Sequence, residues 1–436
     1  MENIEYSGYW WLPLKEDEKI AGKPEKKIAG TLTFTNDEGI KLRLMGSLHN
    51  YSSRKEQFIN VPIILGVTHE EIITLYDCST YLDIRRSSRR FSIEECCPKL
   101  ALIGRHFTNP NEILFHKAEV QYSYLSYWGE LPGIKKERDY QDNNKLKELR
   151  LTYTVAENIE VTTKDAKISV FYGGREAGKR ESIDLKQYVS LIIEPNKELP
   201  FQDFNSKFQD FRSKFIGPIQ DFITFATDRA NSIAELKLYS YYGDADVDIE
   251  KIPYTIEQLP IKALYKTNYP DIKEQNRLLF QHEMLFSVSD IDNRSSTLER
   301  WFDSRKELDS TFNLFFSIWY KPDMYLNHKF LNLVQVVESY HRRRIETNEE
   351  KNSSLQERAE SYHCCLIKKK KKKEPFLRER LEALLKFELI LDVTNELIQD
   401  KDSFITKVVH TRNYLTHYRE SLKEKAAKGK YLYCLT

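Results

Sequence analysis

Short runs rich in β-branched and aromatic residues fill residues 1–200, and polar turns separate them. Thr31–Phe34 and Lys41–Leu44 alternate polar with apolar side chains, which is the period of an antiparallel strand with one solvated face. Turn-forming pairs such as Pro132-Gly133 interrupt the runs. The pattern predicts a β-rich domain with a sandwich or barrel-like arrangement. The predicted strands are Ala29–Phe34, Ile40–Leu48, Val61–Val67, Glu71–Tyr76, Glu119–Leu125, Leu149–Val155, Lys167–Tyr172 and Tyr188–Ile193.

After the last of these strands, apolar positions recur three and four residues apart, which is the period of a helix. The aromatic stripe from Phe204 to Phe225 predicts a helix buried against the β region. Gly217-Pro218 should kink or interrupt that helix. One or two strands are expected around Leu236–Tyr242. Residues 201–297 are therefore interpreted as a mixed connecting region.

A purely helical pattern takes over at Leu298. A helix is predicted at Phe330–Arg344, and a long apolar-periodic helix follows Pro375. A last helix is expected to begin near Asp402, which would serve as its N-cap. These helices predict a bundle over residues 298–436. The predicted fold class is multidomain α+β, a β-rich N-terminal domain followed by an all-α bundle.

The composition is that of a globular protein, with 40 % hydrophobic and 31 % charged residues. The formal net charge is +1, from 67 basic and 66 acidic side chains, so any nucleic-acid site must be a local patch. The N-terminus has no signal-peptide pattern, and Val61–Val67 falls far short of the roughly 18 apolar residues that span a bilayer. We therefore expect a soluble cytoplasmic protein.

Six cysteines include the adjacent pairs Cys96-Cys97 and Cys364-Cys365. Structural zinc sites space their thiolates so that a loop wraps the ion, and neighbouring His106 or His363 does not repair adjacent cysteines. Free thiols in a reducing compartment are the simpler interpretation. We expect no metal and no cofactor.

The segment from His410 to His417 carries the strongest chemical signal. On a helix, at about 100° per residue, His410, Asn413 and His417 share one side and Arg412 lies at its border. The opposite, packing stripe would consist of Val408, Thr411, Leu415, Tyr418 and Leu422.

Two imidazoles, an amide and a guanidinium on one surface suit the metal-free cleavage of RNA. A histidine moves the proton of the 2′-hydroxyl or of the leaving group, and an arginine holds the phosphate and its developing charge. The spacing alone is weak, because Arg277–His282 and Arg358–His363 repeat it. Arg412 and His417 also lie about 140° apart on a straight helix. Either Arg412 reaches around the helix, or two chains pool their residues.

The bundle resembles a HEPN domain, whose motif is Arg-x4–6-His with a polar residue after the arginine, here Arg412–His417. Glu338–Arg342 resembles the Glu-x-x-His-Arg signature of the ApeA-like HEPN branch. The front end resembles the N-terminal domain that accompanies this HEPN domain in ApeA proteins, through Gly8–Pro13, Gly30–Phe34 and Gly39–Leu42.

The resemblance implies a metal-independent endoribonuclease of bacterial abortive-infection defence, a HEPN homodimer with a composite site, and a phage-derived trigger at the N-terminal domain. The implied catalytic residues are Arg412, His417 and Asn413, supported by His410, Glu338, His341 and Arg342. HEPN domains usually continue with a further apolar helix, and this chain stops at Tyr431–Thr436, so the bundle is expected to lack it.

Two basic clusters are candidate RNA contacts, because neutralising phosphates dominates nucleic-acid affinity. They consist of Arg343, Arg344, Lys368, Lys369, Lys370, Lys371, Lys372 and Lys373. The alternative for the lysine run is a solvated loop. Tyr9–Trp11 is either a ligand surface or, by preference, buried packing. Two competing functions remain, a catalytically silent HEPN module that binds RNA or a partner protein, and a recognition protein whose ligand site lies in the β domain.

Overall fold

The computed structural model describes residues 4–14, 26–35, 37–48, 58–83, 93–142, 144–202, 208–241, 259–267, 280–346, 376–386 and 391–436. The chain divides into two compact units, Met1–Phe302 and Asp303–Thr436. The first is β-rich and the second is helical, so the predicted fold class is confirmed. The three-part division at residues 200 and 297 stays a prediction.

The strands of the first unit are β1 (Ile4–Trp11), β2 (Ile28–Thr35), β3 (Gly39–Leu44), β4 (Phe58–Thr68), β5 (Ile72–Asp83), β6 (Ile93–Ile103), β7 (Lys117–Tyr122), β8 (Lys135–Tyr140), β9 (Leu146–Thr152), β10 (Ile159–Thr162), β11 (Ala166–Lys179), β12 (Ser182–Pro195), β13 (Ile233–Tyr239) and β14 (Ile261–Leu264). Its helical elements are η1 (Pro110–Glu112), α2 (Leu125–Trp128), η2 (Arg212–Ile216), α3 (Gly217–Thr227), η6 (Gln281–Glu283) and most of α4 (Arg294–Glu307).

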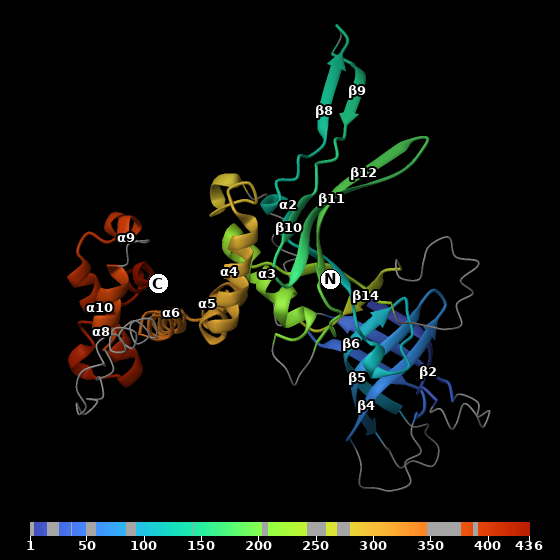
Figure 1. Ribbon diagram of the computed structural model, residues 1–436, viewed down its shortest axis with the longest axis horizontal. Helices are drawn as coiled ribbons and strands as arrows, with labels where there is room; N and C mark the ends of the chain where they lie inside the picture. The colour runs from blue at the N-terminus through green and yellow to red at the C-terminus, as the bar shows by residue number, and fades with distance from the viewer. Residues whose placement is uncertain are drawn as a thin grey trace, which may run out of the picture. The chain divides into compact units, whose positions relative to one another are not determined.

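A barrel closes at β6, which pairs with β3 on one side and with β5 on the other, in the order β6-β3-β2-β1-β4-β5 (Figure 1). The far end of β6 also pairs with β14, through Lys262 opposite Ile103. From β14 the sheet continues through β13, β7, β12, β11 and β10. One strand therefore joins a closed barrel to an open antiparallel sheet.

The barrel interior contains the residues that the alternating pattern selected. Leu32 and Leu42 face each other in register and are buried with Phe34. Trp10 is also buried there and its ring packs against Gly66. The preferred buried packing of Tyr9–Trp11 is confirmed for Trp10 and Trp11 and is wrong for Tyr9, which is 57 % exposed. A Cβ at Gly66 would lie 2.2 Å from Cζ3 of Trp10, so only glycine leaves room for the indole.

Every predicted strand overlaps an observed one, but the pattern missed β1, β6, β8, β10 and β14. In β6 the inward positions include Glu94, which is buried and therefore hides the apolar alternation. Its Oε2 accepts hydrogen bonds from Ser47 Oγ at 2.8 Å and from the Leu48 amide at 2.9 Å. The same contact explains why the predicted strand to Leu48 is wrong at its end: β3 ends at Leu44, and the chain then bends toward Glu94.

The aromatic helix of the connecting region packs into the first unit's larger core. Phe211, Phe215 and Phe222 are buried there, and Phe204 lies outside the described residues. The predicted start is wrong, because Phe208 has a left-handed φ of 61° and the helical run begins at Phe211. The predicted interruption takes the form of a π-helical turn, η2, directly before α3. Pro218 has no amide hydrogen to donate to the preceding turn, so the regular ladder cannot run through it.

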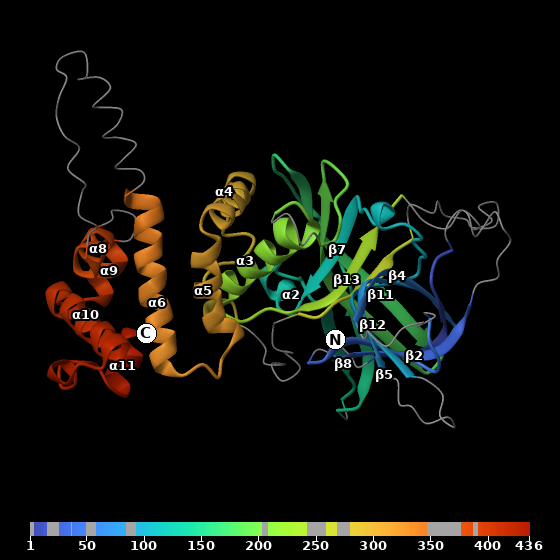
Figure 2. The same cartoon turned by 90° about the horizontal axis from the view of Figure 1, so that it is seen from below.

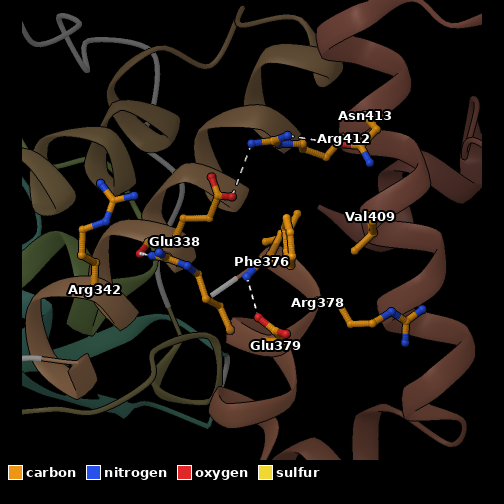
Figure 3. A pocket seen from close by; sticks show the side chains of 10 residues that line it. Glu338, Arg342, Phe376, Arg378, Glu379, Val409, Arg412 and Asn413 are labelled. Carbon is orange, nitrogen blue, oxygen red and sulfur yellow. Dashed lines mark hydrogen bonds and ion pairs between the residues drawn. The ribbon is translucent and has the colours of Figure 1, made fainter. Parts of the chain in front are cut away.

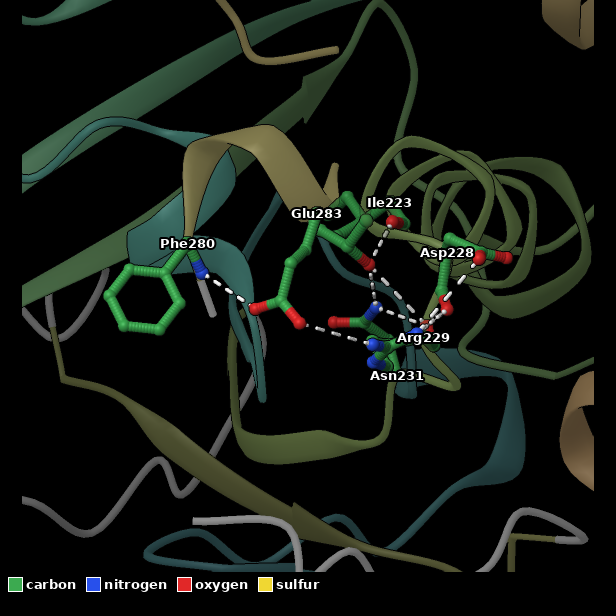
Figure 4. Close-up of polar contacts among 7 residues, drawn as sticks. Ile223, Asp228, Arg229, Asn231, Phe280 and Glu283 are labelled. Atoms are coloured by element: carbon green, nitrogen blue, oxygen red, sulfur yellow. Dashed lines mark hydrogen bonds and ion pairs between the residues drawn. The ribbon is translucent and has the colours of Figure 1, made fainter. Parts of the chain in front are cut away.

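Polar contacts of Arg229, Glu283 and Phe280, called here the polar clasp, hold the end of α3 (Figure 4). Asp228 adopts the left-handed conformation that ends the helix, with φ of 48°. Arg229 Nη2 then lies 3.8 Å from Glu283 Oε1, and the other carboxylate oxygen accepts the Phe280 amide at 3.1 Å. The clasp joins η6 to the α3 corner.

The helices of the second unit are α5 (Asp309–Tyr320), α6 (Leu326–Tyr340), the π-helix η7 (His341–Glu346), α8 (Leu377–Leu385), α9 (Leu391–Leu397), α10 (Lys401–His417), η9 (Glu420–Leu422) and α11 (Lys430–Leu435). Figure 2 shows α6, α8, α10 and α11 packed together. Their shared core is built on Phe330, Val334, Leu381 and Val408. Leu432 of α11 joins this core, and the predicted lack of a further long helix stays a prediction.

Two sequence predictions in this unit are wrong in detail. The single long helix after Pro375 is divided into α8 and α9, because Lys386 closes α8 as its C-cap. The N-cap of α10 is Asp400, not Asp402, because the Asp400 carboxylate accepts the Ser403 amide at 3.0 Å. An aspartate two residues earlier therefore satisfies the free amides of the first turn.

Candidate active site

Helices α6, α8 and α10 surround a pocket of about 600 Å³ within the second unit (Figure 3). Its lining is Glu338, Arg342, Phe376, Leu377, Arg378, Glu379, Arg380, Val409, Arg412 and Asn413. The pocket thus gathers Glu338 and Arg342 of the Glu-x-x-His-Arg signature with Arg412 and Asn413 of the Arg-x4–6-His motif. It leaves His410, His417 and His341 outside its lining.

Local sequence explains why α10 presents Arg412 to the pocket. Ile405, Val408 and Thr411 form the buried stripe, and Thr411 Oγ1 accepts the Ala427 amide at 2.8 Å. Arg412 directly follows this stripe and is partly exposed, which agrees with its predicted border position. The predicted packing role of Tyr418 is wrong: this residue ends the helix in the left-handed conformation and is 68 % exposed.

The Arg412 guanidinium is held from two sides. Its Nη2 lies 3.4 Å from Glu338 Oε1, and its Nη1 donates to Asn413 Oδ1 at 3.1 Å. Glu338 is placed in turn by Arg380, whose Nη1 donates to the Glu338 carbonyl oxygen at 3.0 Å. Because Arg380 is almost fully buried, this contact fixes α8 against the end of α6. Three helices therefore determine where the Arg412 charge lies.

Cations predominate in the pocket wall. Arg342, Arg378, Arg380 and Arg412 line it, against the carboxylates Glu338 and Glu379. Glu379 caps α8 by accepting the Phe376 amide at 2.7 Å. Arginines in such a cleft provide the donor forks that bind phosphate oxygens. The wall therefore suits a phosphodiester.

His417 is the last residue of α10 and is exposed to solvent. It follows Asn413 by four residues, so it lies one turn further along that side of the helix, and His410 lies on the same side by its spacing. The Arg412 guanidinium instead turns toward Glu338 on α6 (Figure 3). Within the described residues of one chain, the Arg412 side chain bonds to Glu338 and Asn413 and forms no hydrogen bond with His417.

Of the remaining predicted residues, Arg343 and Arg344 hold η7 to the end of α4. His341 is buried in η7. Arg343 Nη1 donates to the Glu307 carbonyl at 3.0 Å, and Arg344 Nη1 lies 3.1 Å from the Glu307 carboxylate. Their use as RNA contacts stays a prediction. Lys368, Lys369, Lys370, Lys371, Lys372 and Lys373 lie outside the described residues.

Sequence reasoning missed Phe376, Arg378, Glu379 and Arg380. One signal was present for Arg380, which lies on the buried stripe of α8 between Leu377 and Leu381. An arginine at a core position needs a partner, and the Glu338 carbonyl supplies it.

No group of three or more His, Cys, Asp and Glu side chains comes together as a metal site within the described residues. Cys78, Cys96, Cys97 and Cys434 are free thiols, whereas Cys364 and Cys365 lie outside the described residues. Along the parts of the chain that the structure describes, no helix is both long and apolar enough to cross a membrane.

Comparison with known families gives two matches that cover both units. A family model described as ApeA N-terminal domain 1 matches residues 5–301. A second model, described as Apea-like HEPN, matches residues 331–436, which include the last ten residues of α6 and the helices that follow it. No match is found among curated proteins or solved structures. The two matches confirm the resemblance that the sequence motifs carried.

Proposed function

Because the chain belongs to the ApeA family, which joins this N-terminal domain to a HEPN domain of the anti-phage nuclease type, we propose that it is a metal-independent endoribonuclease. The N-terminal unit controls the nuclease and releases it when a phage-derived trigger binds. The observation that carries the proposal is the Arg412 guanidinium, held by Glu338 in a pocket rich in arginine.

The proposed reaction is a transesterification within RNA. The 2′-hydroxyl attacks the adjacent phosphorus, the bond to the 5′-oxygen breaks, and the products are a 2′,3′-cyclic phosphate and a 5′-hydroxyl. His417 moves the proton, either from the nucleophile or to the leaving oxygen. Arg412 binds the non-bridging oxygens and stabilises the charge that develops on them. Asn413 orients Arg412, since its Oδ1 accepts a hydrogen bond from the guanidinium.

We propose that the catalytic set is completed by a second copy of the chain. Arg412 and His417 point about 140° apart on a regular helix, and Arg412 faces α6 of its own chain. In an isologous dimer the same face is used twice, so His417 of one copy can approach Arg412 of the other. His410 would lie beside the shared cleft.

A catalytically silent HEPN module that binds RNA or a partner protein is the second candidate. The observation that favours it is the same pairing of Arg412 with Glu338, which partly neutralises the guanidinium, together with the position of His417 outside the pocket. One experiment distinguishes the nuclease from the catalytically silent module. Purified protein is incubated with defined RNA in EDTA, and the ends of the products are analysed. Cyclic phosphate ends support the nuclease, and bound but intact RNA supports the silent module.

A further inference from the structure

The hairpin β8–β9 forms a small sheet of its own and projects from the first unit (Figure 1). Every residue of both strands is exposed. A two-stranded sheet without a covered face is marginally stable in water. The hairpin therefore has a surface that a partner would stabilise.

The cross-strand register divides the hairpin into two faces. Lys136 pairs with Leu151, Arg138 with Leu149, and Tyr140 with Leu146. Directly opposed residues share a face. The cationic–aliphatic face therefore consists of Lys136, Arg138, Tyr140, Leu146, Leu149 and Leu151.

The acidic residues of the two strands lie on the opposite face. There Oδ2 of Asp139 lies 3.1 Å from Nζ of Lys147, which is the extra residue at the register shift. Oε1 of Glu148 lies 2.9 Å from Nε of Arg150. Charges on that face thus balance within the hairpin. Within these described strands, the charged side chains of the cationic–aliphatic face are Lys136 and Arg138, and both are cations.

The apolar side chains of the cationic–aliphatic face are unusually open to solvent. Tyr140 and the three leucines are between 44 % and 52 % exposed. The root of the hairpin is anchored, because a Cβ at Gly174 of β11 would lie 2.5 Å from the Tyr153 hydroxyl oxygen. A contiguous apolar patch on an anchored projection is typical of an interaction site.

We propose that the cationic–aliphatic face binds a partner protein that presents an aliphatic patch bordered by carboxylates. The leucines require apolar surface in the partner, and the two unopposed cations require negative charge beside it. A second copy of the same face would bring no carboxylate to Lys136 and Arg138, because that face contains cations and no acidic residue. RNA fits less well, because three of the four apolar side chains are leucines and Tyr140 alone offers a ring for base stacking. This surface lies in the first unit, and binding there does not depend on the proposed nuclease activity.

Fluorescence anisotropy of the full chain tests the proposal with two labelled peptides, one alternating glutamate and leucine and the other alternating lysine and leucine. Wild type should bind the acidic peptide about tenfold more tightly than the basic one. The double variant Lys136→Glu/Arg138→Glu should reverse that order. The control Lys135→Glu/Arg150→Glu changes two cations on the opposite face and should keep the wild-type preference.

The leucines have their own test. Leu149→Ser/Leu151→Ser should weaken acidic-peptide binding about tenfold. The variant Lys136→Glu/Arg138→Glu keeps the leucines, so its binding to the basic peptide shows that loss of binding in other variants does not come from unfolding of the hairpin. Equal binding of both peptides, or a preference that survives charge reversal, would overturn the proposal. So would oligouridine binding or self-association that Lys136→Glu/Arg138→Glu abolishes, because RNA or a second copy would then be the occupant.

Discussion

Nη2 of Arg412 lies 3.4 Å from Oε1 of Glu338, so a carboxylate on α6 holds the guanidinium that α10 presents to the pocket. The two side chains are 74 residues apart in sequence, and both belong to motifs that the sequence analysis singled out separately. Because Glu338 contacts Arg412, the Glu-x-x-His-Arg signature and the Arg-x4–6-His motif form one site.

Replacing Glu338 by glutamine should lower RNA cleavage without unfolding the bundle. The Glu338–Arg412 pair is partly exposed. We therefore expect its loss to raise the activation free energy of cleavage by about 1 kcal/mol, which lowers the rate roughly fivefold. Single-turnover cleavage measures the effect. Glu420→Gln is the matched control, because that carboxylate is exposed and pairs with Lys423 on the surface. Equal rates for the two variants would show that Glu338 does not position Arg412.

Mixing two inactive proteins tests the shared cleft. Arg412→Ala and His417→Ala chains, allowed to exchange subunits, should regain part of the activity, because one of the two clefts in a heterodimer keeps both intact residues. Native mass spectrometry of the mixture establishes that heterodimers form. Heterodimers without cleavage would indicate that each chain works alone.

Gly66→Ala should destabilise the barrel. The new methyl group would lie 2.2 Å from the Trp10 ring, and overpacking of this kind costs about 1–3 kcal/mol. Thermal unfolding of the full chain checks it, with Thr33→Ala on the same barrel as the control. A melting temperature equal to that of the control would mean that the indole moves aside freely.

The four thiols within the described residues should fall into two reactivity classes. Burial raises the pKa of the Cys78 thiol well above its ordinary value and also raises the pKa of Cys96. Cys97 and Cys434 are exposed. Iodoacetamide at neutral pH should therefore label the exposed pair quickly and the buried pair only after unfolding. Peptide mass spectrometry assigns each site, and rapid labelling of Cys78 in folded protein would contradict the buried barrel core.

The same pKa shift has a consequence for stability. The folded state favours the neutral thiol of Cys78. The contribution of this thiol to the free energy of unfolding is therefore fully present below the ordinary thiol pKa of about 8.5. Above that pH the unfolded chain loses the proton first, and stability should fall as pH rises. Cys78→Ala should flatten this alkaline decline in a series of thermal melts.

The sequence predicted the fold class and most strands, because alternation at positions such as Leu32 and Phe34 records burial directly. It failed where a polar residue occupies an inward position, as Glu94 does in β6, since local pattern does not show a distant hydrogen-bond partner. It placed Arg412 at the border of its helix face correctly. It missed Arg380, because the need for this buried cation appears only when α8 packs against α6.

Cleavage of a 5′-labelled RNA by wild type, Arg412→Ala and His417→Ala protein in EDTA tests the central claim most directly. Both side chains lie away from the buried stripe, so their removal should cost little stability, and His328→Ala serves as the exposed-histidine control. The account predicts cyclic phosphate products from wild type and the control, and none from either variant. Wild-type cleavage rates in the His417→Ala protein would contradict it.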